Sequence, residues 1–374
     1  MFVFIILVFS VLAASGFNFS IERRVRLRQL RVEGDAQPTR CDYLCAGAER
    51  PSGEQLVFFV DEANACVKAL AISTSSSTTS SDATCESKPV SVYRSPKDGV
   101  PRVVDYVRGS DLLLVVEALL NRASNRKKHF LLAIRRQKAE DADGADSWRV
   151  EQRERLTTTP TAWDEERFMQ LHALPDGRLL CGMSKSKQLE LFDTSSSAST
   201  SPQASLAINT SANANPNGDL KLLRSHAVLH LHFKFFSFAL GVVDGAALLF
   251  ASVEGDEFVR ILRLSAESAP GPPTAQPLRF IEADASRLLW RGSPDGASGH
   301  LLCGQWDKRQ YAHSVDAWRV SCGGQSTELM GSALSVADGE GFDIECWCSL
   351  SNDKIIFNDM HRAQLVLAII CDSQ

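Results

Sequence analysis

Residues 55–72 of the chain, QLVFFVDEANACVKALAI, carry the pattern that most restricts the fold. An apolar run ends on Asp61, a short polar turn follows, and a second β-rich run begins at Cys66. Two such runs joined by a short polar segment are typical of antiparallel strands and their turn. The first strand of this unit returns, in altered form, at residues 56–60, 112–116, 179–183, 247–251, 300–304 and 355–357. The sequence therefore indicates a repeat protein built from strands.

Each copy has further strand-like residues on either side of the pair. One strand is expected before every pair, and most copies have a more polar strand after it. Units of four strands at about 50 residues each predict an all-β fold, a six-bladed β-propeller. The blades are expected near residues 41–95, 103–156, 169–233, 235–282, 287–331 and 342–370 plus 21–32. A seven-bladed propeller and a two-domain β protein are the alternatives.

The two ends of the chain favour a closed ring. The sixth unit ends at Ile370, directly after its third strand, and has no outer strand of its own. Residues 21–32, IERRVRLRQLRV, are strand-like and have no partner in the first unit. We expect them to supply the missing strand, because an open ring would leave unpaired strand edges that invite aggregation. A short helix is the alternative, since Arg and Leu also favour helices.

The strand–turn–strand unit resembles six-bladed propeller repeats of the NHL and YWTD types. Residues 56–70, LVFFVDEANACVKAL, and residues 355–368, IIFNDMHRAQLVLA, carry the resemblance. In both, an apolar strand ends near an Asp, a turn follows, and a second apolar strand begins. The other four copies depart from the pattern at the Asp and in turn length. The resemblance implies the propeller fold and selects no function, because propellers host many unrelated activities.

The first sixteen residues predict export from the cell. Residues 1–16, MFVFIILVFSVLAASG, combine an apolar run with small residues at a cleavage region, as signal peptides do. A short membrane anchor is the alternative, although the run falls short of the roughly 20 residues that a span needs. Ten cysteines fit an oxidising compartment. We expect a secreted, extracellular protein with no membrane span, a single propeller over residues 17–374, and a monomer.

Two low-complexity stretches interrupt the units. Residues 73–84 hold ten Ser or Thr in twelve positions, and residues 194–218 are rich in Ser, Ala, Asn and Thr. Neither can bury a core, so both are expected to be loop inserts between strands. Asn209 opens the second insert's Asn-Thr-Ser sequon and is the expected site of N-linked glycosylation.

The innermost strands of a propeller line a central channel, and several of the expected ones carry a polar residue among apolar ones. These residues are Asp42, Asp105, His172, Arg291, Asp343 and Glu345. Converging carboxylates and a histidine can bind calcium or act in acid–base catalysis, so Asp42, Asp105, His172 and Glu345 are candidate ligands or bases. The alternative is that a water-filled channel needs polar lining in any case, with Arg291 balancing the acids.

Charge distinguishes between partner classes. A net charge of −5 argues against a nucleic-acid surface over the whole protein, and aromatic residues do not interleave with the basic ones. Four basic residues nevertheless gather in one predicted loop: Arg122, Arg126, Lys127 and Lys128. They are candidate contacts for a sulfated glycan or an acidic protein. The alternative is an ordinary solvated loop.

Three cysteine pairs are candidates for disulfides. Cys303 with Cys322, and Cys66 with Cys85, are expected on neighbouring strands of one unit, while Cys348 or Cys346 is expected near Cys371. Buried thiols are the alternative. Cys181 and Cys303 occupy equivalent points of non-adjacent units and are too far apart to pair, since bridged Cα atoms lie within about 7 Å.

The sequence favours a secreted, non-catalytic binding module that engages a protein or glycan through loops on one propeller face. Common hydrolase and nucleotide-binding motifs are absent, and no cofactor is expected, although calcium remains a candidate. The alternative is a calcium-dependent hydrolase with its site in the channel. A structural or coat component is a third hypothesis, suggested by the Ser/Thr-rich inserts.

Overall fold

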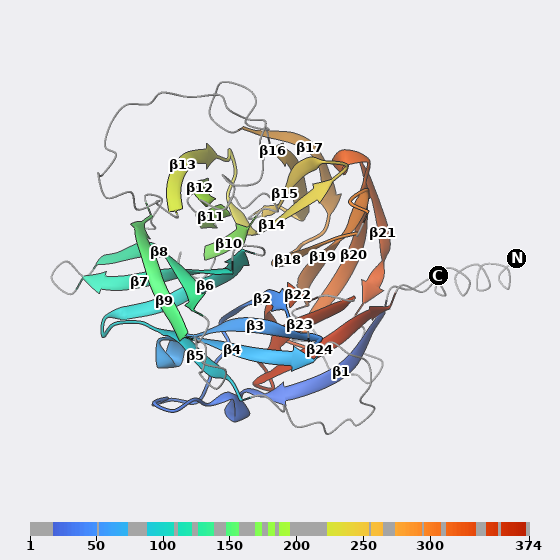
Figure 1. The fold of residues 1–374 in the computed structure, drawn as a ribbon. Helices are drawn as coiled ribbons and strands as arrows, with labels where there is room; N and C mark the ends of the chain where they lie inside the picture. The colour runs from blue at the N-terminus through green and yellow to red at the C-terminus, as the bar shows by residue number, and fades with distance from the viewer. Residues whose placement is uncertain are drawn as a thin grey trace, which may run out of the picture.

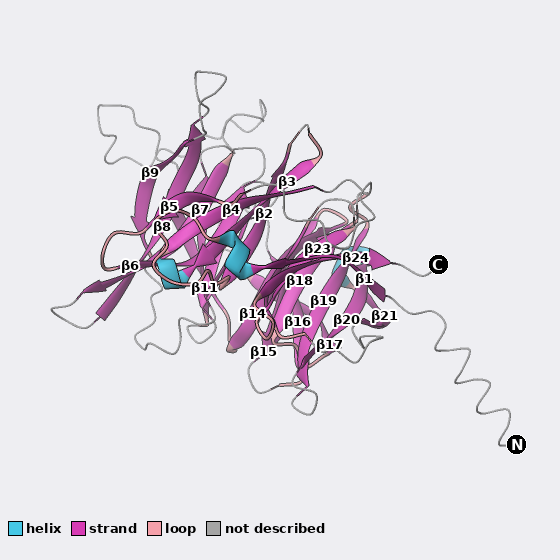
Figure 2. Ribbon diagram, turned by 90° about the horizontal axis from the view of Figure 1, so that it is seen from below, coloured by secondary structure: helices cyan, strands magenta, loops and turns pink. Residues whose placement is uncertain are grey.

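The computed structural model describes the strands of the chain and most of the turns between them. The described residues are 18–50, 52–73, 88–107, 111–121, 126–137, 147–156, 169–173, 179–183, 187–194, 223–253, 256–264, 274–293, 295–307, 312–333, 342–350 and 353–371. Residues 1–17, most of both low-complexity inserts and Asn209 lie outside them. Within these ranges the helices are short 3-10 turns, and no helix is long and apolar enough to cross a bilayer (Figure 2).

The described strands form six four-stranded antiparallel sheets. Within each sheet the strands pair in the order in which they occur in the sequence, except that β1 joins the last sheet. The first sheet contains β2 (Tyr43–Glu49), β3 (Glu54–Asp61), β4 (Cys66–Ser73) and β5 (Val90–Arg94). The second contains β6 (Gly99–Val107), β7 (Leu112–Asn121), β8 (Arg126–Gln137) and β9 (Ser147–Arg155). The third contains β10 (Met169–Ala173), β11 (Leu179–Met183), β12 (Gln188–Thr194) and β13 (Leu223–His230).

The second half of the chain repeats this arrangement. The fourth sheet contains β14 (Phe235–Val243), β15 (Ala246–Val253), β16 (Phe258–Leu264) and β17 (Ala275–Glu282). The fifth contains β18 (Arg287–Gly292), β19 (Ser298–Asp307), β20 (Ala312–Ser321) and β21 (Ser326–Ala333). The sixth contains β22 (Ile344–Ser349), β23 (Lys354–Asp359), β24 (Gln364–Cys371) and, from the other end of the chain, β1 (Asn18–Arg26).

The first strands of the six sheets surround a common centre (Figure 1). Each contacts the first strand of the next sheet, from β2 through β6, β10, β14 and β18 to β22, and β22 contacts β2. The ring of sheets is therefore closed, and the predicted all-β propeller fold is confirmed.

Closure of the ring depends on β1. This strand pairs antiparallel with β24, from Asn18 opposite Cys371 to Arg26 opposite Gln364. The expected strand at residues 21–32 is thus confirmed up to Arg26. After Arg26 the alternative prediction, a short helix, is correct for one turn. This turn is η1 (Leu27–Leu30), a 3-10 helix that buries its two leucines. The turn carries the chain off the sheet edge toward β2.

Burial of both sheet faces explains why the repeat appears as an apolar run and not as a simple alternation. In β3 every residue from Gln55 to Asp61 is buried. Val57 and Phe59 pack in a core with residues of the sixth sheet, whereas Phe58 and Val60 pack in a core with the second sheet. Successive side chains point to opposite faces, so a sheet held between two others needs apolar residues at both.

A fully buried lysine fixes the segment between β1 and β2 to the first sheet. The Lys68 ammonium on β4 lies 2.6 Å from Asp35 and 2.7 Å from Asp61, and it donates to the Thr39 hydroxyl at 2.8 Å and the Leu30 carbonyl at 3.2 Å. Burial alone would raise the Asp35 pKa, but hydrogen bonds from Lys68 and the Val32 N–H bring it below its usual value. A buried ammonium needs such partners because its desolvation is otherwise too costly.

Replacing this lysine is expected to be severely destabilising. Lys68→Met removes the cation between the buried Asp35 and Asp61 carboxylates and leaves Asp35 paired with Arg94 alone, which should lower the free energy of unfolding by about 3–5 kcal/mol. Urea titration followed by tryptophan fluorescence measures the change. Lys97→Met, at an exposed position, is the matched control and should change it by less than about 0.5 kcal/mol. Equal stabilities of the two variants would contradict the assigned role of Lys68.

Candidate functional site

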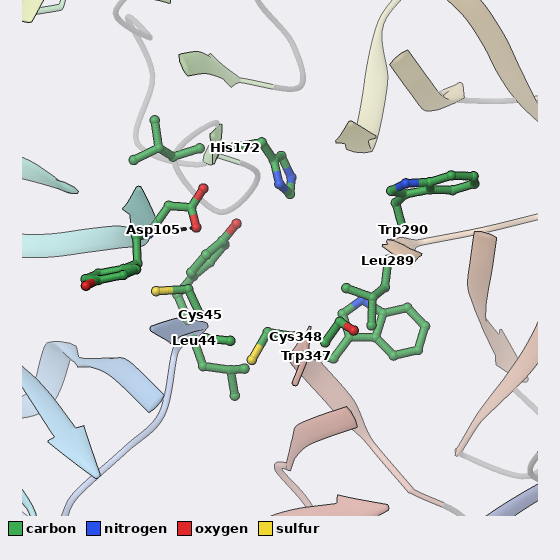
Figure 3. Close-up of a pocket in the computed structure, with 13 residues that line it drawn as sticks. Leu44, Cys45, Asp105, His172, Leu289, Trp290, Trp347 and Cys348 are labelled. Atoms are coloured by element: carbon green, nitrogen blue, oxygen red, sulfur yellow. Dashed lines mark hydrogen bonds between the residues drawn. The ribbon is translucent and has the colours of Figure 1, made fainter. Parts of the chain in front are cut away.

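The centre of the ring holds a cavity of about 520 Å³ (Figure 3). Its wall comes from the innermost strands of five sheets: β2, β6, β10, β18 and β22. A smaller cavity of about 70 Å³ adjoins it and shares Tyr43, His172, Leu289 and Trp347. The lining of the smaller cavity includes the starts of the inner strands, where Asp42, Arg287 and Glu345 lie. The channel therefore has a charged end and a more aromatic interior.

Four of the six channel residues predicted from the sequence line these cavities, whereas Arg291 and Asp343 line neither of them. Asp105 and His172 line the larger one, and Asp42, His172 and Glu345 line the smaller one. Figure 3 shows Asp105 and His172 on neighbouring parts of the wall, with both side chains directed into the same space. The alternation of polar and apolar residues in the inner strands thus located the lining of the channel.

His172 is the channel residue with an uncommitted polar atom. Its Nε2 is buried and has no hydrogen-bond partner in the described part of the chain. Its ring packs edge-on against Phe238, with the centroids 4.9 Å apart. Burial lowers the His172 pKa to about 4, and a hydrogen bond with the Phe238 backbone only partly offsets this. At neutral pH the imidazole is therefore uncharged, and its Nε2 can form one hydrogen bond with a ligand, as donor or acceptor according to the tautomer.

Asp42 is held at the charged end of the channel by the backbone of the next turn. Its Oδ2 accepts a hydrogen bond from the Glu62 N–H at 3.0 Å, and its Oδ1 lies 3.8 Å from Arg40. Burial, and then the negative charge of Glu62, raise the Asp42 pKa to about 6. The carboxylate thus has a structural role in the first sheet.

The other two predicted carboxylates also have internal partners. Asp105 Oδ1 accepts the Tyr106 N–H at 2.8 Å, and Glu345 lies 3.4 Å from the Arg287 guanidinium. Arg287 also donates to the Glu345 carbonyl at 2.8 Å. The sequence assigned Arg291 to balance the channel acids, but Arg291 pairs with Asp353 instead. Arg287, four residues earlier on β18, takes that place at the charged end.

Metal-ligand geometry occurs away from the channel. Among the described residues, one group has three ligand atoms within 4.8 Å of one another: Asp35, Asp61 and Cys66. The Lys68 ammonium lies within hydrogen-bond distance of both carboxylates, so a cation already fills this position. Asp42, Asp105, His172 and Glu345 share the channel, but no three of them form such a group.

Two tryptophans that sequence reasoning missed form rigid parts of the cavity wall. Trp290 stacks on Phe250 with centroids 4.8 Å apart, and a Cβ at Gly241 or Gly299 would clash with its indole. Trp347 Nε1 donates to the Leu288 carbonyl at 3.3 Å. The signal was present in the sequence, because both tryptophans lie in inner strands beside the polar residues that were selected. Packing holds both rings in place.

The basic residues do not form the expected loop. Arg126, Lys127 and Lys128 lie at the start of strand β8, and Lys128 is exposed. Arg122 lies outside the described residues. The correction follows from the β7–β8 ladder, which extends to Asn121 opposite Arg126 and so leaves only four residues between the strands.

The predicted bridge between Cys303 and Cys322 is wrong. Both cysteines are free, the first buried and the second exposed. Register explains the error: Cys303 on β19 lies opposite Asp316 on β20, six residues before Cys322. At about 3.3 Å per strand residue this separation is far beyond bridging distance. Cys66 and Cys348 are also free and buried. Their expected partners, Cys85 and the Cys371 side chain, lie outside the described part of the chain.

No family model matches the sequence, and no curated protein matches it. A chain in a crystal structure of the mitotic checkpoint complex is similar over 95% of this chain and 97% of its own, with 11% identity and a TM-score of 0.47. A Lactobacillus plantarum protein is similar over 89% and 85%, with 14% identity and a TM-score of 0.44. Chaetomium thermophilum Sqt1, bound to the N-terminus of the ribosomal protein L10, is similar over 87% and 70%, with 12% identity and a TM-score of 0.43. Similarity at this level carries no functional argument, so the site rests on its own geometry.

The raised pKa of Asp42 predicts a specific pH dependence of stability. The folded-state pKa of about 6 lies above the usual value of about 3.9 in an unfolded chain. The stabilising contribution is therefore complete below about pH 4 and is lost as the pH rises through 6. Asp42→Asn keeps an acceptor for the Glu62 N–H and removes the titration. Its free energy of unfolding should exceed that of the wild type by on the order of 2 kcal/mol at pH 7.5, with no difference at pH 4.

Urea unfolding at several pH values between 4 and 7.5 measures this difference. Asp256→Asn, at an exposed position, is the control and should follow the wild type at each pH. If the wild type and Asp42→Asn differ by a constant amount at every pH, Asp42 does not titrate with a raised pKa.

Proposed function

We propose that this protein is a secreted, non-catalytic binding module that holds a protein partner at its central channel, with each four-stranded sheet as one of six blades. The observation that carries the proposal is the 520 Å³ cavity, which combines fixed aromatic walls with the unpartnered Nε2 of His172. Ligand sites are typically concave and mostly apolar, with a few polar groups that fix orientation, and occupy about 300–1,000 Å³. A large apolar side chain of a partner fits this description.

Binding is favoured over hydrolysis by what the channel carboxylates do. Asp42 and Asp105 accept hydrogen bonds from backbone N–H groups, and Glu345 pairs with Arg287. A general base must reach the proton that it removes, and calcium needs several oxygen ligands around one point. Carboxylates engaged by their own sheet or by the neighbouring one serve neither role without rearrangement. His172, with its pKa lowered to about 4, is also a weak base.

A protein partner is favoured over a sulfated glycan by the charge of the channel. Three acids, Asp42, Asp105 and Glu345, line its cavities. An anionic polysaccharide would be repelled there, whereas an apolar peptide side chain would not. The exposed Lys128 lies on the third strand of the second sheet, away from the innermost strands. A glycan bound at that strand would belong to a separate surface.

Peptide selection tests the channel directly. We expect a random-peptide display library, panned against the purified protein, to enrich sequences with an aromatic or branched aliphatic residue. Ser349 lines the cavity, so Ser349→Trp should fill the space and weaken binding of the enriched peptides by about tenfold or more. Ser349→Ala leaves the space open and is the matched control. Fluorescence anisotropy with labelled peptides gives the dissociation constants.

Two outcomes of this experiment would overturn the proposal. In the first, the selected peptides bind Ser349→Trp as tightly as the wild type, which would place them outside the cavity. In the second, no peptide is enriched while heparin-type glycans bind, which would favour the glycan partner and the basic strand.

Secretion is supported by residues 1–16 and by the ten cysteines. Expressed from its full sequence in a eukaryotic secretory host, the chain should enter the medium with its new N-terminus near Phe17, as read by Edman sequencing. Retention in the cells with Met1 intact would contradict secretion. The same sample tests calcium: the binding module should contain less than one equivalent and keep its melting temperature in EGTA. One bound equivalent and a lowered melting temperature would favour the hydrolase.

A further inference from the structure

Two cysteines from opposite ends of the chain meet where the ring closes. Cys41 and Cys346 are both free thiols in the structure, and their Sγ atoms lie 3.8 Å apart. Cys41 directly precedes β2, the inner strand of the first sheet, and Cys346 lies on β22, the inner strand of the sixth. Both are buried in the core between these sheets. The two sulfur atoms are therefore in contact across the junction between the first and last repeats.

We propose that Cys41 and Cys346 form a disulfide that fastens the first sheet to the sixth. A disulfide needs two sulfur atoms whose backbones are already close, and rotation about the Cα–Cβ bonds then shortens a contact to about 2.05 Å. The contact between β2 and β22 provides that proximity. This pair was not among those expected from the sequence, because its members lie 305 residues apart.

Surrounding contacts hold the Cys41 backbone in register with the sixth sheet. Asn358 on β23 donates from Nδ2 to the Cys41 carbonyl at 2.6 Å. The Cys346 thiol itself approaches that carbonyl at 3.8 Å. The backbone on one side of the pair is thus fixed by the sheet that carries the other. Cys348, two residues further along β22 and also buried, is the competing partner for Cys41.

This inference rests on the secretion proposed above, because the bond would form by thiol–disulfide exchange with a small-molecule disulfide of an oxidising compartment. One cysteine thiolate attacks that disulfide, which gives a mixed disulfide and releases one small thiolate. The second cysteine thiolate then attacks the protein sulfur of the mixed disulfide and releases the other. Two protein thiols are oxidised to one disulfide, and one small-molecule disulfide is reduced to two thiols.

Burial places this step during folding. Burial raises the pKa of the Cys41 thiol, and the hydrogen bond and charge of Cys346 raise this pKa further. The reactive thiolate is therefore scarce once the ring has closed. Exchange is faster while the last repeat is still docking and both sulfur atoms are accessible. The closed ring then protects the finished bond from reduction.

Oxidative refolding of the full chain tests the proposal. Protein unfolded in guanidinium chloride with dithiothreitol is refolded either in a mixture of reduced and oxidised glutathione or in dithiothreitol alone. After alkylation, non-reducing peptide mapping of the glutathione sample should identify a peptide pair joined through Cys41 and Cys346. The oxidised wild type should melt at least about 5 °C above the reduced wild type, because the bond closes a very long loop in the unfolded chain.

Variants separate this pair from the other thiols. Cys346→Ser should abolish the linked peptide and the difference in melting temperature, whereas Cys348→Ser and Cys322→Ser should keep both. If Cys346→Ser does not fold, the wild-type comparison between the two refolding buffers still decides the question. Complete alkylation of Cys41 and Cys346 after oxidative refolding, or a link from Cys41 to Cys348, would overturn the proposal.

Discussion

The hydrogen-bond ladder between β1 and β24 is the interaction on which the rest of the structure depends. It pairs residues 18–26 with residues 364–371 and so completes the sixth sheet with the opposite end of the chain. Without it, β24 would present an unpaired edge, and the segment that leads into the first sheet would no longer start from the sixth. Two further features lie along the same junction. The Lys68 cluster fixes the segment that leads from β1 to β2, and the Asn358 amide binds the Cys41 carbonyl where β2 begins. Strand pairing, a buried ion cluster and a buried hydrogen bond therefore act together where the ring closes.

Much of this fold was predictable because the second strands of the first and sixth sheets are buried on both faces. Residues 56–60 in β3 and 355–357 in β23 are continuous apolar runs, and such runs are what a strand between two neighbouring sheets requires. The role of Lys68 was not predictable from its repeat. In Val-Lys-Ala-Leu a lysine has the pattern of a solvent-facing residue, and its partners Asp35 and Thr39 lie outside the strand–turn–strand unit. The segment that buries Lys68 belongs to the crossing from β1 to β2, which occurs once in the chain.

The site was predictable in position but less so in detail. One polar residue within an apolar inner strand marks the channel. This rule found Asp42, Asp105, His172 and Glu345, but it also selected Arg291 and Asp343, which line neither cavity. It missed Trp290 and Trp347 because it selected polar residues only, although both tryptophans lie in the same inner strands. It also assigned the wrong arginine, since Arg287 and Arg291 lie on one strand and only three-dimensional contacts show which meets Glu345. The disulfide prediction failed for a similar reason. Cys303 and Cys322 were expected on neighbouring strands, but the sequence does not show which residues of two neighbouring strands lie opposite each other.

The channel illustrates how a propeller centre can be polar in composition and still be suited to binding more than to catalysis. Each of its acids has a partner in the sheet that carries it or in a neighbouring sheet, and these contacts hold strand ends in place, although the charged form of Asp42 still costs free energy near neutral pH. Burial keeps His172 neutral, which removes the charge that a hydrolytic site would use and leaves a directional hydrogen-bonding group. The tryptophans are fixed by packing and by one backbone hydrogen bond. A partner side chain that enters such a cavity meets a pre-organised wall, so its binding free energy is not spent on ordering the site.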